Sequence, residues 1–152
     1  STIEKAKEFL FSPGISVSKD AAVACDTVDV HCMHDPTEGG LAAGLLEIAM
    51  GSGMGLMVDA SRIPVLPESR VICDALGLDP FGMISSGALL VTLAPQEVDR
   101  LIRALEEEGI PACEIGQITT ATEGLKLKTS SEVRELPVFE RDEFARFLRT
   151  KD

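Results

Sequence analysis

The residues with the clearest potential for chemistry form one turn, residues 34–40, with the sequence H-D-P-T-E-G-G. The pattern predicts the end of a strand that passes directly into a helix. Asp35 suits the N-cap of that helix and Pro36 suits its first position, while Glu38 has the spacing of the second member of a capping box. The two glycines that follow leave room for another backbone or a ligand beside the first turn.

Two interpretations of this turn remain open. In the first, it is only the well-capped start of a buried helix, and local chemistry explains it. In the second, it is a ligand site, because free N–H groups and the helix dipole favour an anion at a helix N-terminus. The candidate residues in the turn are Asp35, Thr37, Glu38, Gly39 and Gly40.

A second candidate segment is Ser85-Ser86-Gly87, which precedes the apolar run of residues 88–93. Small hydroxylated residues before a buried strand can line a crevice at the end of a sheet. The alternative is a simple bulge or turn.

The sequence disfavours a metal site, a Cys–His nucleophile and a nucleotide-binding glycine loop. His31 and His34 point to opposite faces of a strand, and the cysteines are not paired as structural zinc sites require, so we expect no metal site. Cys32 and His34 share a strand face, but no third residue that would orient the histidine is evident. The glycines of residues 51–55 lie between a helix and a strand, whereas nucleotide-binding glycine loops run from strand to helix.

The bulk composition narrows the class of protein. The 152 residues suit one domain, 1–152, and the net charge of −11 with a pI near 4.6 disfavours nucleic acid as a partner. The start of the chain does not have the pattern of a signal peptide, and the uncharged stretch 39–58 is interrupted by Glu47 and by a glycine-rich turn. We expect a cytoplasmic protein with reduced thiols and no membrane association.

The elements that must position these residues follow from hydrophobic periodicity and from helix-breaking residues. The strand 28–34 should place Val28, Val30, Cys32 and His34 on one face. The helix 37–50 should be buried on nearly every side. Helices are predicted at 3–11, 37–50, 67–76, 95–108 and 140–149, and a further helix should begin at a cap on Ser16 or Ser18 and end at Ala24. Strands are predicted at 28–34, 54–58, 88–93, 112–118 and 124–129. This mixture indicates a layered α/β domain.

Taken together, the motifs H-D-P-T-E-G-G-L-A, S-S-G-A-L-L-V and E-E-E-G-I-P-A-C-E-I-G-Q-I resemble the C-terminal domain of the AIR synthase (PurM) superfamily. The likeness covers roughly residues 11–128 and is greatest to the AIR-synthase-related and hydrogenase-maturation HypE branch. It implies an α/β (α+β) fold with three α/β/α layers, a mixed sheet and partly ferredoxin-like topology.

The resemblance also implies a division of labour between two domains. ATP and Mg²⁺ are held mainly by an N-terminal ATP-binding domain, which we expect to be absent from this chain, so no cofactor is expected in this domain alone. The expected partners are that N-terminal domain and, in the full-length protein, a second copy in a homodimer. The turn residues and Ser85, Ser86 and Gly87 match positions that face the interdomain cleft.

The expected function is the substrate side of an ATP-dependent enzyme that activates or phosphorylates a small acceptor, with catalytic residues unassigned. The isolated domain should then be inactive. The alternative is a non-catalytic binding or assembly module that keeps the fold. Members of the HypE branch end in a reactive cysteine, whereas this sequence ends F-L-R-T-K-D, so that thiol chemistry is not carried over.

Overall fold

The structure is a computed structural model that describes residues 1–149. Its α-helices are α1 (Thr2–Glu8), α2 (Ser18–Thr27), α3 (Gly40–Ser52), α4 (Pro67–Leu76), α5 (Val98–Glu107) and α6 (Glu143–Arg149). Its strands are β1 (Val30–His34), β2 (Gly55–Asp59), β3 (Leu90–Leu93), β4 (Gly116–Thr119), β5 (Leu125–Lys128) and β6 (Val133–Glu135). Short helical turns lie at Leu10–Gly14, Ala60–Arg62, Pro80–Gly82, Pro95–Glu97 and Ala121–Glu123.

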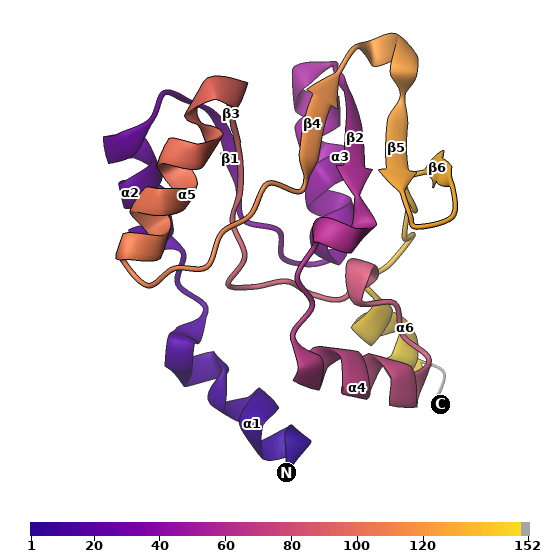
Figure 1. The fold of residues 1–152 in the computed structure, drawn as a ribbon. Coiled ribbons are helices and arrows are strands. Elements are labelled where there is room, and N and C mark those ends of the chain that lie inside the picture. Colours follow the sequence, from indigo (N-terminus) through magenta and orange to yellow (C-terminus); the bar gives the residue numbers. More distant parts are fainter. Residues whose placement is uncertain (150–152) are drawn as a thin grey trace.

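The strands of residues 1–149 form two sheets. β1 and β3 pair antiparallel as a two-stranded ribbon, with His34 opposite Leu90. The other strands form a mixed sheet in the order β4-β2-β5-β6, in which only β2 and β5 run parallel. Figure 1 shows the ribbon beside α2 and α5, and the larger sheet beside α3. The predicted mixed α/β fold is confirmed.

Helices enclose the ribbon on both faces. On one face, Ala24 of α2 and Leu101 and Leu105 of α5 form a buried cluster against which Val91 and Leu93 of β3 pack. Burying these apolar side chains holds α2 and α5 to the ribbon.

Helix α3 lies against the other face of the ribbon and also against the larger sheet. Leu45 and Ala49 of α3 share a buried cluster with Leu56 of β2 and Leu127 of β5, and Leu90 of the ribbon packs against the same cluster. A helix between two sheets must be apolar on nearly every side, which is the pattern predicted for it.

Strand β1 departs from the predicted alternation because it contains a bulge. Val30 pairs with Leu93 but Cys32 pairs with Thr92, so β1 advances two residues while β3 advances one. As a result Val30 packs on the α2 and α5 side, whereas the His34 ring lies next to Gly44 of α3. The prediction that Val30 and His34 share a face is therefore wrong.

The remaining elements largely follow their local signals. The predicted helix 67–76 is α4, with Gly77 as its left-handed C-cap. The prediction at 95–108 resolves into a short turn followed by α5. Strand β6 was not predicted, because its exposed residues 133–135 carry no burial pattern. The predicted helix at the C-terminus begins at Glu143, and residues 150–152 lie outside the described part of the chain.

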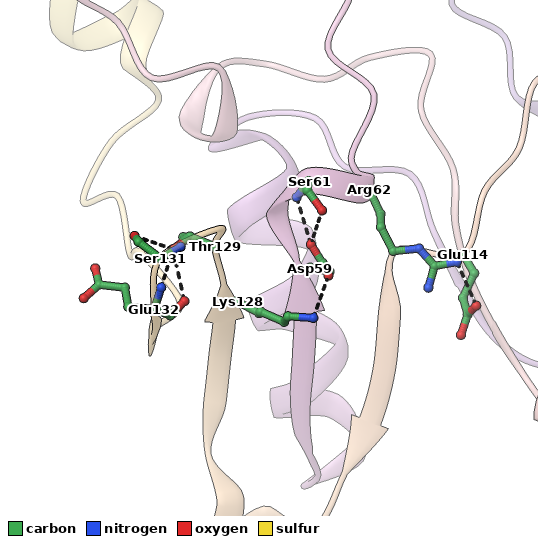
Figure 2. Close-up of polar contacts among 8 residues, drawn as sticks. All are labelled: Asp59, Ser61, Arg62, Glu114, Lys128, Thr129, Ser131 and Glu132. Carbon is green, nitrogen blue, oxygen red and sulfur yellow. Dashed lines mark hydrogen bonds and ion pairs between the residues drawn. The ribbon is translucent and has the colours of Figure 1, made fainter.

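A polar network lies at the ends of the parallel strands β2 and β5 (Figure 2). Asp59 accepts hydrogen bonds from the N–H and hydroxyl of Ser61, and Lys128 lies 3.3 Å from the same carboxylate. These contacts, chiefly that with the Ser61 hydroxyl, hold the pKa of Asp59 below its ordinary value. Arg62 pairs with Glu114 beside this network at 3.1 Å. The network joins the turn after β2 to the end of β5 and to Glu114 before β4.

Candidate functional site

The turn that follows β1 is not the start of a helix. Helix α3 begins at Gly40, its N-cap is Gly39, and no side chain caps it in the way a capping box would. Gly39 and Gly40 have φ angles of +78° and +67°, a conformation that favours glycine and interrupts the helical path upstream of residue 40. The predicted N-cap role of Asp35, the helical position of Pro36 and the capping box with Glu38 are therefore wrong.

The carboxylate that accepts a hydrogen bond at the start of α3 is that of Asp142, which lies directly before α6. Asp142 Oδ2 accepts a hydrogen bond from the backbone N–H of Gly39 at 3.0 Å. Its other oxygen accepts the N–H of Phe144 at 2.8 Å, in the first turn of α6. One carboxylate thus serves the N-termini of two helices, where negative charge is favoured by the helix dipole.

The segment before β3 is also hydrogen-bonded to this turn. The Ser85 N–H donates to the Thr37 carbonyl at 3.2 Å, and the Ser85 hydroxyl donates to the Met83 carbonyl at 3.0 Å. Gly40 lies so close to this segment that an added Cβ would be 2.4 Å from the Met83 oxygen. The turn at 35–40 and the segment 81–87 therefore form one closely packed unit.

Four of the candidate residues line a common hollow, which we call the small hollow. It has a volume of about 190 Å³. Its lining is Ile15, Val17, Asp35, Thr37, Ser86 and Gly87. These residues come from the loop before α2, the turn after β1 and the segment before β3, which lie far apart in the sequence. The hollow offers one carboxylate and two hydroxyls, so its walls suit a ligand that donates hydrogen bonds.

Glu38 lines a different and larger hollow, of about 330 Å³, between the turn and α6. We call it the large hollow. Its lining is Glu38, Ile84, Arg141, Asp142, Phe144, Ala145 and Leu148. The other predicted residues line neither hollow: Gly39 and Gly40 form the bend at the start of α3, and Ser85 holds Thr37 in place.

Sequence reasoning missed Asp142 and Arg141 as parts of this region. The only local signal was that of a helix start, with Asp142 directly before α6 and accepting the N–H of Phe144. Nothing local could show that the second carboxylate oxygen reaches Gly39, because that contact spans 103 positions.

A second carboxylate, Glu143, anchors α6. It accepts the Asp79 N–H at 3.0 Å and binds Arg146 through both oxygens, at 2.6 and 2.7 Å, while Arg146 also donates to the Gly77 carbonyl. The Arg146 hydrogen bonds, followed by that of Asp79, hold the pKa of the buried Glu143 carboxyl below its ordinary value. Glu143 therefore fixes α6 to the end of α4 independently of Asp142.

The histidine of the turn has a partner that the sequence did not suggest. His34 Nε2 forms a hydrogen bond with Glu47 of α3, joining the end of β1 to the middle of that helix. The cysteine on the same strand, Cys32, is exposed, and its Sγ lies 3.7 Å from the Met33 carbonyl oxygen. Within residues 1–149, no group of three or more His, Cys, Asp or Glu side chains is arranged to hold a metal ion. No helix of this same part is long and apolar enough to cross a membrane.

Comparison with known proteins finds curated relatives that are similar to part of this chain. It is 38% identical over 98 residues to the carbamoyl dehydratase HypE of Rhizobium leguminosarum, covering 63% of this chain and 28% of the relative. It is 40% identical over 91 residues to the carbamoyl dehydratase HypE of Cupriavidus necator, covering 59% of this chain and 26% of the relative. The chain thus spans about a quarter of the length of these relatives.

Solved structures show the same relationship. A crystal structure of hydrogenase maturation protein HypE superposes with a TM-score of 0.77 and 28% identity, covering 88% of this chain and 45% of that one. A crystal structure of HypE in complex with ATP gives a TM-score of 0.68 and 31% identity, covering 75% of this chain and 37% of that one. The sequence model of the family "AIR synthase related protein, C-terminal domain" matches residues 7–128. This chain therefore belongs to the AIR synthase related family and carries its C-terminal domain.

Proposed function

We propose that this chain is the substrate-side, C-terminal domain of an ATP-dependent, HypE-like protein that activates or phosphorylates a small acceptor. Relatives named carbamoyl dehydratase and a related structure holding ATP support the ATP-dependent class. The chain spans only about a quarter of those relatives, so the support for its own role comes from its own residues.

The observation that carries this proposal is the small hollow. Asp35, Thr37 and Ser86 bring one carboxylate and two hydroxyls to a space of about 190 Å³ from two separate segments. Asp35 is exposed and is not used as a helix cap, so its carboxylate is free to meet a ligand. Such a lining suits the N–H or O–H groups of a small acceptor.

The same lining fits a triphosphate poorly. It contains no lysine or arginine, and a carboxylate at its wall repels phosphate oxygens. We therefore assign ATP and Mg²⁺ to an N-terminal ATP-binding domain, with this chain closing over the acceptor. That domain is the proposed partner, together with a second copy of the full-length protein in a homodimer.

The first test is calorimetric titration of Mg·ATP into this chain. The proposal expects no binding, and micromolar binding by the chain alone would contradict the division of labour. The second test joins the chain to an N-terminal ATP-binding domain and measures ATP turnover with the acceptor present.

In the joined protein, Asp35→Asn should lower turnover at least about tenfold, because a group that contacts the reacting acceptor is lost. Asp29→Asn is the matched control, since Asp29 is also an exposed aspartate near β1 but lies outside both hollows. Equal activity of the folded Asp35→Asn and Asp29→Asn proteins would exclude the assigned role of Asp35. A joined protein without turnover would favour a non-catalytic binding module.

A further inference from the structure

We infer that Asp142 is a positioning residue of the candidate site, and that α6 is therefore one of the elements that build it. This inference rests on the proposed function, since the turn it concerns carries Thr37 and Asp35. The hydrogen bonds of the Asp142 carboxylate go to the N–H groups of Gly39 and Phe144, which do not line the small hollow. Asp142 acts through Gly39, which follows Asp35 and Thr37 in the chain.

The geometry of the carboxylate shows what it holds. Asp142 Oδ2 accepts the Gly39 N–H at 3.0 Å and Oδ1 accepts the Phe144 N–H at 2.8 Å, so each oxygen has one backbone donor. Hydrogen bonds to an ionised acceptor are stronger than neutral ones. The bond to Gly39 fixes the peptide plane that joins the turn to α3.

The other contacts of the turn are made by its neighbours Thr37 and Gly40, which lie against residues 81–87. On the side of residues 81–87, the Ser85 N–H donates to the Thr37 carbonyl at 3.2 Å, which also accepts the Gly40 N–H at 3.1 Å. Gly39 itself has a φ of +78°, a conformation that favours glycine, and its N–H donates to the Asp142 carboxylate. Removing the acceptor at position 142 should let this bend move while the Thr37–Ser85 bond remains.

The anchoring of α6 makes this role separable from simple folding. Glu143 binds the Asp79 N–H and Arg146, and these contacts do not involve Asp142. An Asp142 variant should therefore keep α6 docked. The loss should be confined to the two N–H groups that Asp142 serves.

The test compares Asp142→Ala and Asp142→Asn with Glu140→Ala, a matched control that removes an exposed carboxylate from the same segment. The first readout is amide hydrogen exchange of Gly39 in this chain. We expect Asp142→Ala to accelerate that exchange about tenfold, as loss of a charge-assisted hydrogen bond implies. Asp142→Asn should give an intermediate value because its amide keeps one acceptor oxygen, and Glu140→Ala should give no change.

The second readout is ATP turnover in the joined two-domain protein. A positioning role predicts that Asp142→Ala lowers kcat about tenfold with the KM for ATP unchanged, since the nucleotide is assigned to the other domain, and that Asp142→Asn restores part of the rate. A kcat equal to that of Glu140→Ala would overturn the inference, as would unaltered Gly39 exchange. If the unmodified joined protein had no turnover, the proposed function would fail, and Gly39 exchange alone would decide whether Asp142 holds the turn.

Discussion

Gly40 lies against the backbone of Met83, so close that a Cβ on Gly40 would be 2.4 Å from the Met83 carbonyl oxygen. The same Cβ would be 2.6 Å from the carbonyl oxygen of Phe81. The start of α3 and the segment before β3 therefore touch through their main chains. This contact holds together two of the three segments that line the small hollow.

Gly40→Ala should destabilise the protein by at least about 3 kcal/mol, because it combines a backbone clash with a left-handed conformation at φ +67°. Gly53→Ala is the matched control: Gly53 has a φ of +66° but no atom within 4 Å of its added Cβ. It should cost only about 1 kcal/mol. Urea denaturation of both variants measures the difference, and equal losses would show that the contact with Met83 is unimportant.

Two glycines within α3 should respond to alanine in opposite directions. At Gly44 an added Cβ would be 2.8 Å from the Pro36 Cβ and 3.2 Å from the Leu90 side chain, so Gly44→Ala should destabilise by about 1–3 kcal/mol. At Gly51 the same Cβ meets nothing within 4 Å, and Gly51→Ala should stabilise by about 0.5–1 kcal/mol through helix propensity. Thermal unfolding of the pair checks this. A stabilised Gly44→Ala protein would contradict the close packing of α3 on β1 and β3.

Glu143 should contribute stability that depends on pH. Its pKa lies below the ordinary value of 4.5 in the folded state, so folding favours the ionised form. The contribution is therefore complete at pH 7 and is lost as the pH falls below about 4.5 towards the folded-state pKa. Glu143→Gln should cost about 2 kcal/mol at pH 7.

Urea denaturation of the Glu143→Gln variant from pH 7 to pH 3 measures this dependence. The difference from the unmodified protein should shrink as the pH falls. Glu140→Gln, at a nearby exposed position, serves as the control for the general effect of removing a negative charge. A difference that stayed constant with pH would show that the charge of Glu143 is not what stabilises α6.

The four free cysteines should divide into two reactivity classes. Cys25, Cys32 and Cys113 are exposed, whereas Cys73 of α4 is buried, and burial raises the pKa of its thiol above the ordinary value. A disulfide reagent at pH 8 should label three thiols rapidly and Cys73 only with unfolding, because the thiolate is the reacting form. Peptide mapping after a timed reaction identifies the sites. Rapid labelling of Cys73 in the folded protein would contradict its burial.

Elements with local start and stop signals were the ones that the sequence predicted well. Pro67 and Gly77 bound α4, and the apolar stripe of α5 contains Leu101 and Leu105, both buried. These signals depend on residues within one or two turns of each other, so no knowledge of the rest of the fold is needed.

Features that depend on distant partners were missed. The start of α3 was placed too early because Asp35 and Glu38 have the spacing of a capping box, while the carboxylate actually present is that of Asp142. The bulge in β1 depends on its register with β3, which alternation within one strand does not reveal. For the candidate site, Asp35, Thr37, Ser86 and Gly87 were named from sequence and share one hollow. The sequence alone could not show that Ile15 and Val17 lie beside them, because those two residues come from a separate segment of the chain.

The sequence model of the family ends at residue 128, but the contacts that complete this fold continue to α6. Leu136 belongs to the buried cluster between α3 and the larger sheet, and the Phe139 ring covers Gly82. Asp142 then binds Gly39, and Glu143 binds Asp79. A fragment cut at the family boundary would expose apolar surface and leave two backbone donors without acceptors. The segment that matches the family's sequence model is therefore shorter than the segment whose contacts complete the fold.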